Sequence, residues 1–261
     1  MSGFGITVLG SGSSGNATVV HAPEGDILVD AGFSGREMLK RFTQAKLDPT
    51  RVKAMLITHE HSDHVKGCRI FCEQFGVPTY LTKRTQDALS QGKYLGPKQA
   101  LIAAGSPFML CGAEISPFSV PHDASDPVGY TFSFGGRKIG LATDLGALNM
   151  LSTQRLKGCA ALVLESNHDM DMLRNSARPL HLKRRIMGRL GHMNNADAMS
   201  ALESLLTEGS QCVILAHLSG ECNCLDLVRA MAREQLAKMR RDDILLLVAE
   251  QERPIETFWL R

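Results

Sequence analysis

The segment from residue 59 to residue 64 places three imidazoles and two carboxylates within six residues, in the order His59-Glu60-His61-Ser62-Asp63-His64. It follows an apolar run that is typical of a buried strand. His59 and His61 are two residues apart, so both rings can point to the same side of an extended backbone. His64 follows where a helix begins and can face a second ion. Because imidazole nitrogens and carboxylate oxygens bind Zn²⁺ and similar metals, the spacing predicts a site for two adjacent ions.

Four further residues stand singly at the C-terminal ends of apolar runs. They are Asp30 in Leu-Val-Asp-Ala-Gly, His122 in Val-Pro-His-Asp, Asp144 in Leu-Ala-Thr-Asp and His217 in Leu-Ala-His-Leu-Ser. A single histidine at a strand end is usually a hydrogen-bonded polar residue. A single residue of this kind does not indicate a functional site, so these positions are informative only when the set is considered in its order along the chain.

The pattern His-x-His-x-Asp-His at residues 59–64 resembles the signature of the metallo-β-lactamase superfamily at every position. The four single residues occur in the order in which members of that superfamily place their remaining site residues. The resemblance implies seven ligands for two metal ions: His59, His61 and His122 for the first ion, Asp63, His64 and His217 for the second, and Asp144 as a bridge. It also implies that Asp30 orients a ligand histidine rather than binding metal. The expected cofactor is a pair of divalent ions, zinc or manganese, because both accept these donors.

The second half of the chain is similar to the phosphodiesterase branch of that superfamily, which includes tRNase Z-like and DNA-exonuclease-like members. In that branch a histidine at a helix start approaches the scissile phosphate, and Gly-His192-Met-Asn194-Asn195 matches that position. A hydroxide shared by the two ions is the expected nucleophile, oriented by Asp63. His192 is expected to stabilise phosphate charge or to protonate the departing oxygen. His168, in Leu-Glu-Ser-Asn-His, is expected either to bind phosphate or to brace Asp144.

Candidate substrate contacts come from three less specific features. The turn at residues 10–16 contains Ser11, Ser13 and Asn16, which could line a pocket or simply form a tight turn. The helix start at Asn194 would offer backbone donors to an anion. Between residues 174 and 189 the chain has six basic residues and no acidic one, Arg184 among them. Such a run suits successive phosphates, although it is also compatible with a solvated helix face.

Composition excludes several classes of protein. Of the 261 residues 44% are hydrophobic and 21% charged, which is typical of a globular chain with a core and not of a disordered one. No uncharged apolar run approaches the ~18 residues of a membrane span, and the N-terminus lacks the pattern of a secretory signal. The 29 basic and 27 acidic residues nearly balance, so a nucleic-acid site must be a local patch. Seven cysteines without framework spacing suit reduced thiols, and we expect a cytoplasmic protein.

The predicted elements support one α/β domain over residues 1–261. Strands are expected in the first half, together with a helix that begins at Ser34, a buried strand at 52–58, a helix at 65–75 and a hairpin at 135–136. After Asp144, strands alternate with helices, including helices at 179–190 and 195–206 and a strand at 212–216. Two sheets packed face to face with helices outside follow from this order. With the resemblance, they predict the four-layer αββα sandwich of the metallo-β-lactamase fold.

These features favour a phosphodiester hydrolase that depends on two metals and acts on nucleic acid. DNA as the substrate and 5′→3′ exonuclease polarity follow from resemblance to the small single-domain bacterial exonuclease group alone. The alternatives are a phosphodiesterase for small nucleotides or cyclic phosphates and a tRNase Z-like RNA nuclease. The latter is disfavoured because His-Met-Asn replaces the His-Ser-Thr usual in tRNA processing. An inert scaffold is disfavoured because no candidate ligand is missing.

Overall fold

Short apolar segments pair into two mixed sheets in the computed structural model, which describes residues 3–90 and 93–261. The first sheet has the order β14 (Phe258–Trp259), β1 (Gly5–Gly10), β2 (Ala17–Ala22), β3 (Gly25–Val29), β4 (Val52–Leu56), β5 (Thr79–Thr82) and β6 (Gln99–Ile102). The second has the order β13 (Leu245–Val248), β12 (Cys212–Ala216), β11 (Ala161–Glu165), β10 (Arg137–Ala142), β9 (Val128–Phe134), β8 (Ala113–Ser119) and β7 (Phe108–Leu110).

Strand direction decides where the ends of the strands meet. Strands β3 to β6 are parallel in the first sheet, and β10 to β13 are parallel in the second. Strand β8 pairs antiparallel with β9, and β9 pairs antiparallel with β10, so β8 and β10 run the same way. The carboxyl ends of these strands therefore gather residues that are far apart in sequence, as open α/β sheets generally do.

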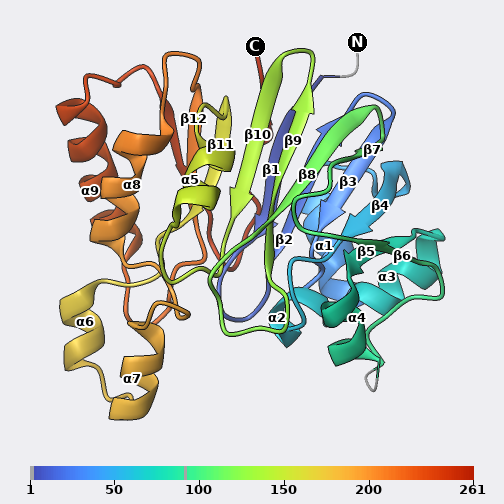
Figure 1. Cartoon of the computed structure of the whole chain (residues 1–261), viewed down its shortest axis with the longest axis horizontal. Helices are drawn as coiled ribbons and strands as arrows, with labels where there is room; N and C mark the ends of the chain where they lie inside the picture. Colours follow the sequence, from blue (N-terminus) through green and yellow to red (C-terminus); the bar gives the residue numbers. More distant parts are fainter. Residues whose placement is uncertain (1–2, 91–92) are drawn as a thin grey trace.

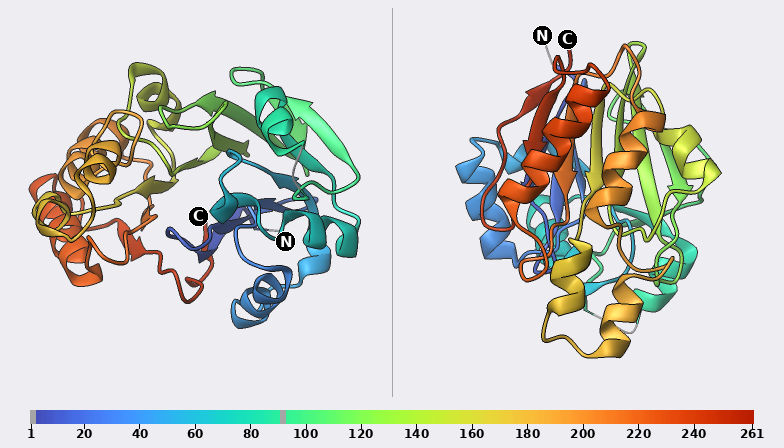
Figure 2. Two further views of the ribbon diagram at one scale, coloured as in Figure 1. Left: turned by 90° about the horizontal axis from the view of Figure 1, so that it is seen from below. Right: turned by 90° about the vertical axis from the view of Figure 1, so that its left-hand side faces the viewer.

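Helices cover the outer faces of both sheets (Figures 1 and 2). On the side of the first sheet lie α1 (Gly35–Gln44), α2 (Ser62–Val65), α3 (Cys68–Phe75) and α4 (Lys83–Leu89). On the side of the second lie α5 (Met150–Leu156), α8 (Asn195–Leu205) and α9 (Leu225–Lys238). Helices α6 (Met170–Asn175) and α7 (Leu180–Ile186) extend beyond the sandwich, at the lower left of Figure 1. No helix among the described residues is both long enough and apolar enough to cross a bilayer.

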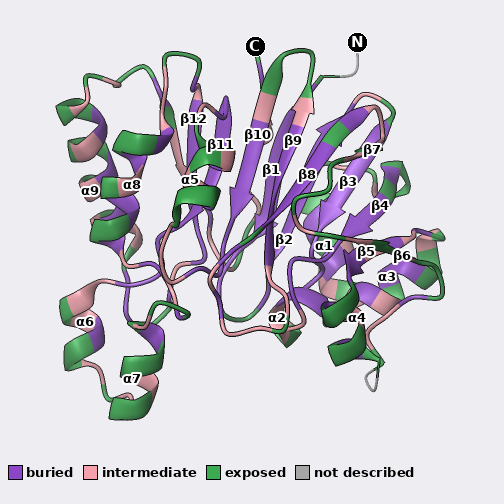
Figure 3. Ribbon diagram, in the orientation of Figure 1, coloured by how far each residue is buried: buried purple, intermediate pink, exposed green. Residues whose placement is uncertain are grey.

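Three separate apolar cores establish the order of the layers. The core between the sheets contains Ile6, Val29 and Phe132. A second core joins the second sheet to α5, α8 and α9, and a third joins the first sheet to α1 and α3. Most strand residues are accordingly buried on both faces (Figure 3). The predicted αββα sandwich is confirmed.

Two predicted helices differ from the structure because glycines allow the backbone to approach closely. The helix expected at 65–75 is interrupted at Gly67, whose N–H donates to Ala31 O at 2.7 Å. A Cβ at Gly67 would lie 2.2 Å from Phe33 O, so only glycine fits there. The helix expected at 179–190 ends at Ile186, whose carbonyl accepts the N–H of His192 at 2.9 Å. Because α7 ends at Ile186, the chain can turn back, and His192 then lies beside Glu165 at the carboxyl end of β11.

Candidate metal centre

The candidate ligands occupy the turns that follow the parallel strands. His59 comes after β4, His122 after β8, Asp144 after β10 and His217 after β12. Asp144 and His217 have positive φ angles of 58° and 56°, and Asp30 after β3 has 60°. This left-handed conformation is uncommon outside glycine and costs energy. It is maintained here in three turns at the same edge of the molecule.

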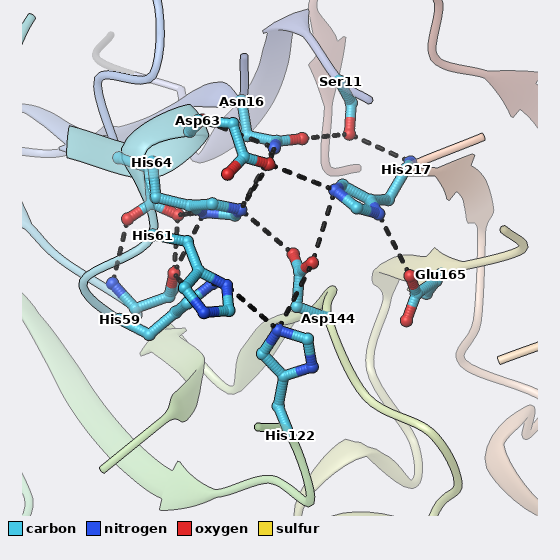
Figure 4. A network of polar contacts seen from close by, with 12 residues as sticks. Ser11, Asn16, His59, His61, Asp63, His64, His122, Asp144, Glu165 and His217 are labelled. Atoms are coloured by element: carbon cyan, nitrogen blue, oxygen red, sulfur yellow. Dashed lines mark hydrogen bonds and ion pairs between the residues drawn. The ribbon is translucent and has the colours of Figure 1, made fainter. Parts of the chain in front are cut away.

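The first group of donors comprises His59, His61 and His122. One ligand atom from each lies within 4.8 Å of the others. His61 Nδ1 is 3.1 Å from His59 Nε2 and 3.3 Å from His122 Nε2. The structure thus brings together the three side chains predicted for the first ion (Figure 4).

The second group comprises Asp63, His64 and His217, again with ligand atoms within 4.8 Å of one another. Asp144 lies between the groups. Its Oδ2 is 3.1 Å from His64 Nε2, and its Oδ1 is 3.3 Å from His217 Nε2 and 3.9 Å from His122 Nε2. One carboxylate faces both groups, which is the arrangement expected of a bridging ligand (Figure 4).

The two sheets share the ligands. Residues 59–64 belong to the first sheet and its helix α2, whereas His122, Asp144 and His217 follow strands of the second sheet. The centre therefore lies across the open edge of the sandwich.

Two buried atoms of the centre indicate that the donor set fits cations. Asp144 Oδ2 and His217 Nε2 are buried and have no hydrogen-bond partner among the described residues. Buried polar atoms are normally hydrogen-bonded, and exceptions need a cause such as an ion. Burial raises the pKa of Asp144, but the charges of His217 and His64 outweigh it and hold that pKa well below its usual value. The carboxylate is thus anionic and available as a ligand.

Carboxylates and carbonyls fix the orientation of the ligand histidines from behind. Asp30 Oδ2 is 2.7 Å from His64 Nδ1, so His64 presents Nε2 to the centre. The Asp30 carboxylate also accepts from Thr58 N and Thr58 Oγ1, at 2.9 and 2.8 Å. His122 Nδ1 is 3.1 Å from Gly191 O. Such contacts set the tautomer and direction of a metal-binding imidazole, which is the role expected of Asp30.

Glu165 is a site residue to which the sequence analysis gave no role. It ends β11 and is fully buried, with Oε1 2.8 Å from His192 Nδ1 and 3.0 Å from His217 Nδ1. Its Oε2 accepts from Leu145 N at 2.8 Å. Burial lowers the pKa of His192, but the charge of Glu165 and its hydrogen bond outweigh burial and raise that pKa. The only sequence signal was an acidic residue at the end of an apolar strand.

A hollow of about 290 Å³ opens over the centre. It is lined by Ser13, His61, Ser62, Asp63, His122, Asp144, Arg185, His192 and His217. His192 stacks on His217 with ring centroids 5.2 Å apart, so a protonatable group lies beside the metal ligands without belonging to the predicted set. Arg185 pairs with Asp123 and reaches the hollow from α7.

The structure shows what four of the predicted substrate-binding residues contact. Ser11 Oγ donates to Asn16 Oδ1 at 2.9 Å and accepts from His217 N at 3.0 Å. Asn16 Nδ2 lies 3.1 Å from His64 Nε2, so both residues contact candidate ligands, and Ser11 also lines a neighbouring hollow. The Asn194 side chain caps α8 by accepting from Asp197 N at 2.9 Å. Arg184 is exposed and does not line the hollow, where Arg185 lies instead.

His168 also lies outside the hollow. Its ring is buried, with Nδ1 3.3 Å from Asn167 Oδ1. Its carbonyl accepts from Asn195 N at 2.9 Å, which ties the segment after β11 to the start of α8. Burial lowers the pKa of His168 to about 4, so the ring is neutral. Among the described residues, no hydrogen bond or ion pair joins His168 to Asp144, so the contacts do not support the expected bracing of Asp144 by His168.

The family model described as beta-lactamase superfamily domain matches residues 26–217, the span that contains all seven candidate ligands. The chain belongs to this family. It is 36% identical over 236 residues to exodeoxyribonuclease YycJ of Bacillus anthracis, covering 90% of this chain and 89% of that protein. It is 32% identical over 240 residues to exodeoxyribonuclease WalJ of Streptococcus pneumoniae, with the same coverage.

Solved structures agree on the fold. The metallo-beta-lactamase fold protein YhfI of Bacillus subtilis superimposes with a TM-score of 0.73 at 15% identity, covering 97% of this chain and 99% of that one. The chain is therefore a metallo-β-lactamase-fold hydrolase, and that fold implies bound divalent metal.

Proposed function

We propose that the protein is a metal-dependent phosphodiesterase that removes nucleotides from DNA as a 5′→3′ exonuclease. The observation that carries the proposal is His192, which the buried Glu165 carboxylate holds against a complete set of metal donors. Similarity over most of the chain to two exodeoxyribonucleases supports DNA as the substrate. The polarity rests on the resemblance noted in the sequence.

We propose two ions, zinc or manganese, for the centre. His59, His61 and His122 would hold one, Asp63, His64 and His217 the other, and Asp144 both. When bound, such a pair activates the attacking water and neutralises the charge of the phosphate.

The chain's own residues would supply proton transfer and positioning. Glu165 lies 2.8 Å from His192 Nδ1, and its charge raises the pKa of His192 against the lowering effect of burial, so it favours the imidazolium form, which carries a second proton on Nε2. His192 is therefore placed to protonate the departing oxygen or to stabilise phosphate charge. Asp63 Oδ2 lies 3.8 Å from His217 Nε2 and lines the hollow, so it can orient the attacking group.

The basic segment around α7 would guide the rest of the strand. Arg174 and Arg178 pair with Asp171 and Glu221, and Lys183 Nζ donates to two carbonyls. Arg184 and Arg189 are exposed and form no ion pair with a described residue. These two guanidiniums, with Arg185 at the rim of the hollow, are available to phosphates.

A substrate panel tests the proposal. The protein, loaded with Zn²⁺ or Mn²⁺, is incubated with 5′-labelled duplex DNA, single-stranded DNA, RNA and bis-p-nitrophenyl phosphate. We expect stepwise release of nucleotides from the 5′ end of DNA. Turnover of the chromogenic ester alone would instead support the small-nucleotide phosphodiesterase, and preference for RNA would support the RNA nuclease.

The variant His192→Ala tests the proposed proton donor. We expect it to retain the metal content of the wild type and to lose roughly 10²–10⁴-fold in rate, the usual contribution of general acid catalysis. His181→Ala, at an exposed position on α7, is the matched control with the chromogenic ester. Normal turnover by His192→Ala would refute the assigned role.

A further inference from the structure

A second hollow, of about 360 Å³, adjoins the one over the metal centre, and the two share Ser13. Its walls are the turn after β1, the loop between β12 and α9, and the segment after β13 at residues 249–252. Helix α7 contributes no residue to it. Its volume falls within the ~300–1,000 Å³ of small-molecule pockets.

The walls of this second hollow are fixed by hydrogen bonds that need no ligand. Gln251 Oε1 accepts from Ser14 N at 2.7 Å, and Gln251 Nε2 donates to Gly15 O at 2.9 Å. Asn223 Nδ2 donates to Ser166 O and Asn167 O, both at 2.9 Å. The segment after β13 is thereby joined to the turn after β1, and the hollow is formed in advance.

The charged residues that line the second hollow differ from those that line the hollow over the metal centre. No lysine or arginine lines it, whereas the carboxylates of Glu250 and Glu252 do. Glu250 pairs with Arg253 and with Arg229, and Glu252 forms no ion pair with a described residue. The apolar part of the lining includes Leu218 and Leu225. A phosphate would find no cation in this lining, whereas a flat neutral ring with N–H donors would find apolar faces and acceptors.

We propose that the second hollow binds the terminal nucleoside of the strand. This inference rests on the proposed phosphodiesterase function and deepens it. With the scissile phosphate over the metal centre, the nucleoside on one side of that phosphate enters the second hollow, and the rest of the strand leaves past Arg185. Because the lining offers no cation to a further phosphate, continuation of the strand through the hollow is disfavoured, and the pocket favours cleavage at the end of a chain.

Chromogenic esters test the pocket by kinetics. Thymidine 3′-(p-nitrophenyl phosphate) carries a nucleoside attached as at a 5′ end, and bis-p-nitrophenyl phosphate carries none. We expect the wild-type KM for the thymidine ester to be lower by about tenfold or more, because the base would cover the apolar surface of Leu218 and Leu225. Cys224→Trp, which fills the hollow from its exposed wall, should remove this difference, and Cys224→Ser should preserve it. Met109→Trp, at an exposed position on β7, is the control for a new tryptophan.

Alkylation of Cys224 tests binding without catalysis. Cys224 is the exposed one of the seven free cysteines, so its reaction with N-ethylmaleimide can be followed by intact mass. We expect thymidine to slow this reaction in the metal-loaded protein and inorganic phosphate not to slow it. Hydrolysis of DNA with equal KM values for the two esters and no protection by thymidine would overturn the nucleoside pocket alone. Failure to hydrolyse DNA or either ester would overturn the proposed function.

Discussion

Glu165 connects two histidines with different tasks, because one carboxylate oxygen lies within hydrogen-bonding distance of both His192 and His217. A buried carboxylate with two imidazole partners is stable as an anion, since their charges and hydrogen bonds outweigh the burial that raises its pKa. Its charge in turn favours the protonated form of His192.

The variant Glu165→Gln should therefore change the pH dependence of the rate. Removing the charge lowers the pKa of His192, so the protonated fraction is lost at a lower pH and the alkaline limb of the kcat profile moves to lower pH. A profile of kcat against pH with the chromogenic ester measures this shift. An unchanged alkaline limb with an overall lower rate would mean that Glu165 only supports the fold.

Asp144 should be indispensable for metal binding, because its two oxygens face both groups of donors. We expect Asp144→Asn to lose metal and activity together, since an amide presents one weaker acceptor and no charge. Metal content by elemental analysis of the purified variant checks this. Asp171→Asn, at an exposed position on α6, is the matched control. Wild-type metal content in Asp144→Asn would contradict the bridging role.

Sequence alone identified the seven candidate ligands that the structure brings together, because a dense motif and ordered strand-end residues carry that information. It did not predict Glu165 or Arg185, whose roles depend on which side chains meet across strands. The hydroxyl of Ser11 and the amide of Asn16 were expected to face substrate. Both form hydrogen bonds to candidate ligand residues 48 or more positions away, which the sequence did not predict.

At the scale of elements, the centre depends on close backbone approach between turns. Gly32, in the turn after β3, packs against the backbone of α2, and a Cβ there would lie 1.6 Å from Asp63 O. Asn16 N donates to the same Asp63 carbonyl at 2.8 Å. The first two strands, the turn after β3 and the ligand segment are thus held in one arrangement.

The variant Gly32→Ala should disturb the centre through the backbone. We expect a loss of roughly 1–3 kcal/mol or more in the free energy of unfolding, as for overpacking, together with weaker metal binding. Denaturant unfolding and metal titration measure the two effects. Gly209→Ala, where a Cβ meets nothing closer than 4.0 Å, is the control. Equal stability of the two variants would show that the contact is not tight.

Most strands and long helices were predicted because apolar runs and capping residues are local signals. Short elements with weaker patterns were not, among them α4, α5 and α6. The interruption at Gly67 was missed because its cause, the carbonyl of Phe33, comes from another turn. Local propensity cannot report such a contact.

At the scale of the whole molecule, net charge is nearly neutral, yet exposed cations gather on and beside α7. This segment projects beyond the sandwich (Figure 1), and its Arg185 lines the hollow over the candidate metal centre. The sequence identified the basic run but not which members are free, because that depends on partners such as Glu221 and Asp123.

The double variant Arg184→Gln, Arg189→Gln should weaken DNA binding mainly at low salt. Each lost phosphate contact lowers the slope of log K against log salt by about 0.7–0.9. Binding isotherms of the metal-loaded protein with labelled DNA at several salt concentrations measure the slope. Arg36→Gln, at an exposed position on α1, is the control. A slope equal to that of the wild type would place the strand elsewhere.

Because the candidate ligands come from both sheets, bound metal would also join the two halves of the sandwich along one seam. Ligands that bind only the native state add to its stability. We therefore expect chelation to lower the melting temperature and to speed digestion by proteases. In cells depleted of these ions, we then expect a lower amount of the protein, because the metal-free form would be degraded and would not accumulate.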